Sequence, residues 1–279
     1  MNLRLGVVVG LCIGVLALGA SYASGGAQSS VACGASVTSD ITLTSDLVCS
    51  GDGLIVSAGG VTVDLNGYAI IGAGSGVGVN TYLSDGVTIE NGSVVGFRIG
   101  INVGGTGQSS TVSTLRNLRV VHNSQTGVFA VFGPTLISGN AIAENGVGIT
   151  TNSSQRLEIV HNTISRNQGD GIFAGRSNSS GLVVSSNRIS DNGGFGISVA
   201  DQGAVIDSNV VIGNGRTGIS ATETVPEAYP TEYAISNNRA DRNGELGIFV
   251  THGLLADAGG NTAKHNGDPR ECVNITCGS

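Results

Sequence analysis

The chain has 279 residues, of which only 12% are charged and 4% aromatic, with no Trp and 46 Gly. Gly and Asn are poor helix formers, so this composition excludes a predominantly helical protein, while the abundant Val, Ile, Ser and Thr suit strands and turns. A formal net charge of −7 without a basic stripe excludes nucleic acid and anionic membranes as expected partners.

The first segment has the pattern of a secretory signal peptide. Residues 1–23 carry Arg4, an apolar run from Leu5 to Ala20 and a small residue at Ala23, after which we expect cleavage. A retained membrane anchor is the alternative, but the apolar run is short for a span of about 20 residues. The sequence predicts an exported chain, secreted or at the cell surface, with the periplasm as an alternative and no membrane span after signal removal.

Four cysteines remain after the signal. An even number in an exported chain favours disulfides, and sequence alone permits three pairings. Cys33 and Cys49 precede the repeats described below, whereas Cys272 and Cys277 follow them. These positions favour Cys33–Cys49 and Cys272–Cys277 as clips at the two ends. Neither pair has the further ligands of a zinc site, and we expect no metal centre.

One phrase recurs through the rest of the chain, Asn-x-(Ile/Val)-x-x-Asn-x-x-x-Gly-(Ile/Val). Its second Asn returns at steps of 22 to 29 residues, too short for a helix-containing repeat of 33 or more. Each step has room for two or three short strands, so the phrase predicts a parallel β-helix. The second Asn falls at Asn123, Asn145, Asn167, Asn192, Asn214, Asn243 and Asn266.

Each part of the phrase has a structural interpretation. Asn tolerates left-handed turn conformations, and amides stacked one coil apart can form a hydrogen-bonded ladder. Gly at the next bend is expected to serve the same backbone need. Apolar residues such as Ile164 and Ile172 should stack inward. The residues before the second Asn, from His122 to His265, alternate in charge, which predicts surface ion pairs worth about 0–1 kcal/mol each.

The repeats also set the predicted boundaries. We expect a signal peptide over 1–23, a lead-in and cap over 24–53, the β-helix over 54–267 and a disulfide-containing tail over 268–279.

Three segments near the start resemble the opening of secreted bacterial β-helix repeat proteins: Cys33-Gly34, Leu47 to Leu54 and Val61 to Gly67. From about Cys33 to Cys277 the chain looks like a right-handed parallel β-helix of the pectin-lyase-like superfamily, with repeats shared by carbohydrate-binding proteins and sugar hydrolases. The resemblance implies an all-β, single-stranded right-handed parallel β-helix (solenoid) of roughly nine coils of 22–29 residues with disulfide-clipped ends. It implies a polysaccharide or cell-surface glycan as the partner.

Enzymes of that superfamily act on acidic or neutral polysaccharides, but their motifs are not found. There is no Gly-His-Gly with paired aspartates and no Asp-Pro-His-Glu, because the segment from Asp268 to Glu271 has Arg270 where the epimerase motif needs His. We therefore expect carbohydrate binding or a cell-surface scaffold without a catalytic centre. A polysaccharide lyase, hydrolase or epimerase is one alternative, and a structural or adhesion protein is another.

The strand after the Gly supplies the first candidate site. Because strand side chains alternate, an outward row is predicted in which Phe129 and Phe173 lie two coils apart, or about 9.6 Å. The row contains no acid or base, whereas sugar hydrolysis needs two carboxylates about 5 to 9 Å apart. The Phe residues are expected either to bind sugar or to be ordinary strand residues under a loop. The predicted row is Asn102, Phe129, Thr150, Phe173, Ser198, Ser220 and Phe249.

The corner after that strand supplies the second candidate, because insertions collect there. The longest insertion, Thr222 to Tyr233, has three carboxylates and two Tyr, which suit a sugar or a calcium ion. A solvated loop is the alternative interpretation, and no other cofactor is indicated. Besides the Phe residues, the ligand-binding candidates are Asn152, Arg176, Asp201, Glu223, Glu227, Tyr229 and Tyr233.

Overall fold

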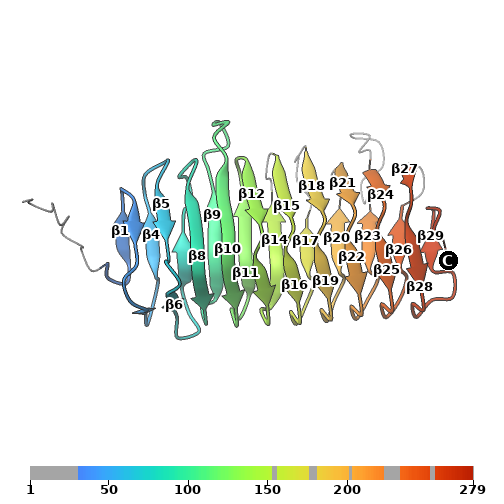
Figure 1. Ribbon diagram of the computed structural model, residues 1–279, viewed down its shortest axis with the longest axis horizontal. Coiled ribbons are helices and arrows are strands. Elements are labelled where there is room, and N and C mark those ends of the chain that lie inside the picture. The colour runs from blue at the N-terminus through green and yellow to red at the C-terminus, as the bar shows by residue number, and fades with distance from the viewer. Residues whose placement is uncertain are drawn as a thin grey trace, which may run out of the picture.

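Short strands with alternating burial form the protein, as the Val- and Ile-rich segments predict. The computed structural model describes residues 31–152, 156–175, 181–200, 203–222, 233–251 and 255–278. In β17 (Ile172–Ala174), for example, the two end residues are buried and Phe173 is exposed. The strands stack side by side in about nine turns and form a rod (Figure 1).

Three parallel ladders run along the rod, and we call them sheets 1, 2 and 3. Sheet 1 follows the Gly of each phrase, and its strands lie in the order β1 (Ala35–Val37), β4 (Leu54–Val56), β7 (Val77–Asn80), β9 (Ile99–Gly104), β11 (Thr126–Val131), β14 (Val147–Asn152), β17, β20 (Ile197–Ala200), β23 (Ile219–Thr222), β26 (Ile248–Val250) and β29 (Cys272–Val273).

Sheets 2 and 3 share the long strands β8 (Thr88–Val95) and β10 (Ser113–Val121), which pair in both. The other strands of sheet 2 are β2 (Ile41–Thr42), β5 (Thr62–Asp64), β12 (Thr135–Ser138), β15 (Leu157–Val160), β18 (Leu182–Ser185), β21 (Ala204–Asp207), β24 (Tyr233–Ser236) and β27 (Leu255–Gly259). Those of sheet 3 are β3 (Leu47–Val48), β6 (Ala69–Ile71), β13 (Ala141–Ala143), β16 (Thr163–Ser165), β19 (Arg188–Ser190), β22 (Val210–Ile212), β25 (Arg239–Asp241) and β28 (Thr262–Lys264).

The core consists of inward columns in which like residues align from coil to coil. In sheet 1, Ile149, Ile172 and Ile197 are register partners and are fully buried. In sheet 3, Ile164 and Ile189 are aligned and buried in the same way. The prediction of inward apolar stacks is confirmed.

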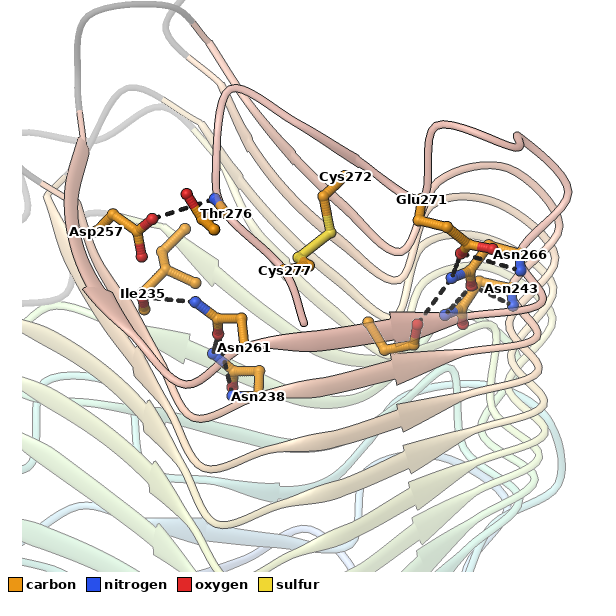
Figure 2. Close-up of a disulfide and its surroundings, with 11 residues drawn as sticks. Ile235, Asn238, Asn243, Asp257, Asn261, Asn266, Glu271, Cys272, Thr276 and Cys277 are labelled. Carbon is orange, nitrogen blue, oxygen red and sulfur yellow. Dashed lines mark hydrogen bonds between the residues drawn. A yellow bond between two sulfur atoms is a disulfide. The ribbon is translucent and has the colours of Figure 1, made fainter. Parts of the chain in front are cut away.

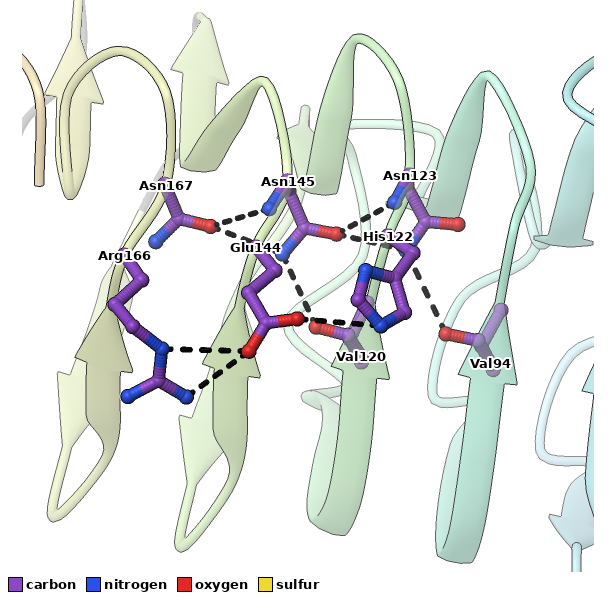
Figure 3. Close-up of polar contacts among 8 residues, drawn as sticks. All are labelled: Val94, Val120, His122, Asn123, Glu144, Asn145, Arg166 and Asn167. Atoms are coloured by element: carbon purple, nitrogen blue, oxygen red, sulfur yellow. Dashed lines mark hydrogen bonds and ion pairs between the residues drawn. The ribbon is translucent and has the colours of Figure 1, made fainter.

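Two ladders of Asn amides line the turns on either side of sheet 3. In one of them, the main-chain N and the Nδ2 of Asn145 both donate to Oδ1 of Asn167, at 2.9 and 3.0 Å (Figure 3). The Nδ2 of Asn145 also donates to the carbonyl of Val120, at 3.0 Å. Asn167 is only 2% exposed. The same bonds recur in the second ladder, from Asn140 to Asn261.

The expectation that the ladder Asn residues have the left-handed backbone of these turns is wrong. The positive φ belongs to the residue immediately before, as in Glu144 (59°) and Arg166 (54°). This residue reverses the chain so that the following Asn points inward, where an amide can both donate and accept. The residue with positive φ then projects into solvent. In Figure 3, Glu144 accepts from Arg166 at 3.1 Å and pairs with His122 at 3.2 Å, which confirms surface pairing in this row.

The recurring Gly of the phrase is required for a different reason from the predicted one. Gly171 does not adopt a positive φ, but a Cβ there would lie 2.7 Å from the carbonyl oxygen of Gly196. It would also lie 2.7 Å from Cγ2 of Ile189 and 2.9 Å from Nδ2 of Asn192. Gly is therefore required because neighbouring coils approach closely, and not because the backbone is left-handed.

Both predicted disulfides are present near the ends of the rod. Cys33–Cys49 joins residues of the first coil, because β1 already pairs with β4 and the predicted lead-in stacks on the next coil. Cys272–Cys277 lies at the other end (Figure 2). There, Oε2 of Glu271 accepts from both N and Nδ2 of Asn266, at 3.3 and 2.6 Å, in place of another ladder Asn.

Candidate functional site

The outward row of sheet 1 has the register predicted from the sequence. Strand pairing aligns Asn102, Phe129, Thr150, Phe173 and Ser198, and continues to Ser220 and Phe249. Phe173 is 38% exposed, and Phe129 is partly exposed on the same face. One strand lies between these two Phe residues, so the strand spacing places them about 9.6 Å apart. The row contains no ionisable side chain.

Amides and hydroxyls accompany the rings in this row. Nδ2 of Asn102 donates to Oδ1 of Asn80, at 3.1 Å. Oδ1 of Asn102 is buried and has no hydrogen-bond partner in the part of the chain that the structure describes. The hydroxyls of Thr126 and Thr150 lie 3.4 Å apart. Rings beside neutral polar groups suit a sugar, whose ring has apolar C–H faces and a polar rim.

The structure places two of the corner candidates among its described residues. Asn152 is exposed at the end of β14. Tyr233 was expected to be a loop residue that contacts ligand, but it is the first residue of β24 and is fully buried. Its hydroxyl donates to the carbonyl of Thr222, at 3.0 Å. Its register partner Ala204 places it in the inward column of sheet 2. The predictions for Arg176, Asp201, Glu223, Glu227 and Tyr229 lie outside the described residues.

Sequence reasoning missed an exposed apolar group at the same corner, several coils earlier. Tyr82, Leu83, Val112 and Phe132 are 48%, 56%, 42% and 40% exposed. The ring centroids of Tyr82 and Phe132 lie 6.4 Å apart. Leu83 and Phe132 have φ values of 68° and 48°, which bulky residues rarely adopt. The adjacent Tyr82-Leu83 pair within a polar loop was the available sequence signal.

A charged cluster at the corner before sheet 1 was also missed. Asp170, Phe195, Arg216 and Glu245 come from four successive coils, just before β17, β20, β23 and β26. The guanidinium carbon of Arg216 lies 4.0 Å from the ring centroid of Phe195, and its Nε lies 3.3 Å from Oε1 of Glu245. Oδ1 of Asp170 accepts from the main-chain N of Phe195, at 2.8 Å.

Burial raises the pKa of Asp170 above its ordinary value of 3.8, although the Phe195 hydrogen bond and the charge of Arg216 oppose the shift. Asp170 and Glu245 are three coils apart, or about 14 Å, which is farther than the carboxylate pairs of glycosidases. The cluster therefore offers one partly buried acid, Asp170, two coils from the cation Arg216, and no pair of carboxylates spaced for hydrolysis.

Asp170→Asn is expected to change how stability depends on pH. Because the folded-state pKa is raised, the folded chain holds the proton more tightly, and the wild type loses stability relative to the variant as pH rises from 3.8 through the raised pKa. Urea denaturation over a pH series measures this difference. The assigned cause is contradicted if the stability of the wild type relative to the variant stays constant with pH, or increases as pH rises.

The described residues offer neither a metal centre nor a membrane-spanning helix. They contain no group of three His, Cys, Asp or Glu side chains placed to hold a metal ion. Over the same residues, no helix has the length and apolar character needed to cross a bilayer.

Comparisons with known proteins agree on the fold. A family model described as "Right handed beta helix region" matches residues 75–232, which is more than half of the chain. No curated protein sequence is significantly similar.

Three solved structures are similar at low sequence identity. The periplasmic alginate epimerase AlgG has a TM-score of 0.62 and 13% identity, over 85% of this chain and 61% of that chain. An alginate lyase from Paenibacillus sp. str. FPU-7 has a TM-score of 0.56 and 15% identity, over 81% and 90%. Tailspike protein 2 from Escherichia coli O157:H7 bacteriophage CAB120 has a TM-score of 0.52 and 15% identity, over 76% and 34%. This chain thus spans about three fifths of the epimerase, and these identities show the fold alone.

Proposed function

The chain belongs to the right-handed β-helix family, and we propose that it is an exported polysaccharide-binding protein whose ligand lies along the outward row of sheet 1. The observation that carries the proposal is the alignment of Phe129 and Phe173 with neutral polar residues on a face without acids or bases. Sugar rings stacked on the two Phe side chains would leave hydroxyls directed at Asn102, Thr150 and Ser198.

Two further findings support this proposal. The disulfides Cys33–Cys49 and Cys272–Cys277 favour an oxidising compartment, which agrees with export to the periplasm or the cell surface. By their names, two of the proteins with a similar fold act on alginate, so an acidic polysaccharide belongs among the first ligands tested. The acidic charge of the chain does not prevent such binding, because the row itself carries no charge.

Phe129→Ala combined with Phe173→Ala is expected to weaken binding to the preferred polysaccharide about tenfold or more, because central aromatic contacts carry much of the energy of an interface. Retention in affinity electrophoresis over a panel of uronate and neutral polysaccharides measures the effect. Val205→Ala is the matched control, since Val205 is 43% exposed, close to the 38% of Phe173, but lies on sheet 2.

The far-ultraviolet circular dichroism spectrum should be the same in all of these variants. If every polysaccharide that retains the wild type retained the double variant equally, the sheet 1 row would not be the binding site.

Polysaccharide cleavage or epimerisation is the second candidate function, and the charged cluster favours it. Asp170, with its raised pKa, and Arg216 lie two coils apart, with Phe195 between them, and supply one acid and one cation beside the same face. A single acid–base group suits proton abstraction better than hydrolysis. Release of unsaturated products or reducing ends, or inversion at a sugar carbon, that is lost in Asp170→Asn would establish this candidate.

A further inference from the structure

A hollow of about 300 Å³ lies on sheet 2, where β10, β12 and β15 begin. Its apolar lining comes from Val112, Pro134 and Leu136, and Val112 is one of the exposed apolar residues of the adjoining corner. Arg156 and Glu158 line the same hollow and are both exposed. The hollow therefore combines an apolar surface with one positive and one negative group, within the size range of small-molecule sites.

Arg156 stands at a position where other coils have Gly with a left-handed backbone. The residue before the first inward residue of sheet 2 is Gly60, Gly86 or Gly181 in three other coils, with φ values of 73°, 70° and 85°. Arg156 adopts a φ of 53° at this position. Gly takes this conformation without steric cost, whereas a residue with a side chain is strained in it.

The two charged side chains of the hollow are unpaired among the described residues. Neither Arg156 nor Glu158 forms a hydrogen bond or ion pair through its side chain within the described ranges. By contrast, Arg116 on the neighbouring coils is paired with Glu90. Register pairing places Thr114, Leu136 and Glu158 in one outward row, and Arg156, two residues before Glu158, lines the same hollow.

We propose that this hollow binds a zwitterion with an apolar side chain, either a free amino acid or a short peptide. The guanidinium of Arg156 takes the carboxylate through paired hydrogen bonds, which its planar fork favours. Glu158 takes the ammonium group, and the apolar side chain lies against Leu136 and Val112. Arg156 and Glu158 are only two residues apart along the chain and line the same hollow, so their long side chains can take the two charged groups of one small ligand. The site lies on sheet 2, so it is independent of the proposed polysaccharide row on sheet 1.

Isothermal titration calorimetry with L-leucine and with leucyl-leucine tests the proposal on the full chain. At least one of these probes should bind, and the tighter one distinguishes the free amino acid from the peptide. Arg156→Gly and Glu158→Gln should each weaken binding about tenfold or more, because each removes a charged hydrogen-bonding partner. Arg119→Gln is the matched control and should bind as the wild type does. Arg119 is an exposed residue in the part of β10 that belongs to sheet 3.

Arg156→Gly also separates a binding role from a structural one. Because Gly suits the left-handed backbone, the melting temperature of this variant should be equal to or above that of the wild type while binding is lost. The proposal is overturned if neither probe binds, if Arg156→Gly binds as tightly as the wild type, or if 4-methylpentanoate, which lacks the ammonium group, binds as tightly as leucine. Phe173→Ala should not change this binding, so its outcome is separate from that of the polysaccharide test.

Discussion

Asn167→Ala is expected to lower the free energy of unfolding by about 4 kcal/mol. The substitution removes the Oδ1 that accepts from both N and Nδ2 of Asn145, and these donors are buried. A buried donor left without a partner costs about 1–3 kcal/mol, and two are created here. The Oδ1 of Asn192 also loses its bond from Nδ2 of Asn167, which is 2.8 Å long. Urea denaturation followed by circular dichroism measures the change.

Gln168→Ala is the control for this substitution, because Gln168 is the exposed neighbour on the same turn. Its effect should stay within about 0.5 kcal/mol, as for most surface substitutions. A loss below about 1 kcal/mol in Asn167→Ala would mean that water or a neighbouring group replaces the amide. The ladder would then not be the main stabilising feature of this turn.

Gly171→Ala is expected to cost about 3 kcal/mol, even though the backbone conformation permits Ala. The added Cβ would lie 2.7 Å from the carbonyl oxygen of Gly196 and 2.9 Å from Nδ2 of Asn192, so adjacent coils would have to separate. The same denaturation experiment measures it. Gly51→Ala is the matched control, since a Cβ there meets nothing within 4 Å and its φ is not positive.

In Gly51→Ala, the loss of chain freedom in the unfolded state should leave stability unchanged or raise it by about 0.4–1 kcal/mol. If Gly171→Ala behaved as Gly51→Ala does, close approach between coils would not explain the recurring Gly.

The spacing of the phrase was enough to predict the coils, the inward columns and the register of the outward row. A regular repeat gives each residue a position relative to those one coil away, so Phe129 and Phe173 can be aligned from the sequence alone. The disulfides followed from their places before and after the repeats. Spacing cannot tell which of two adjacent turn residues is left-handed. The positive φ was therefore assigned to the ladder Asn, whereas Glu144 and Arg166, the residues before them, have it.

The candidate site was less predictable, because exposure depends on what stacks above and below each residue. Tyr233 ends a long insertion, but its pairing with Ala204 makes it the first inward residue of β24. Arg156 and Glu158 are ordinary charged residues in the sequence. Their significance arises only when the start of β15 lies beside Leu136 on β12 and leaves a hollow.

The central claim, that the sheet 1 row binds polysaccharide without catalysis, is tested most directly by one incubation in which bound polysaccharide and released product are both measured. A panel of uronate and neutral polysaccharides should give at least one that is retained by the wild type and lost by the Phe129→Ala, Phe173→Ala double variant. The same samples should show no reducing ends, unsaturated products or epimerised sugars. Product formation that survives the double variant but is lost in Asp170→Asn would contradict the claim and assign the function to the charged cluster.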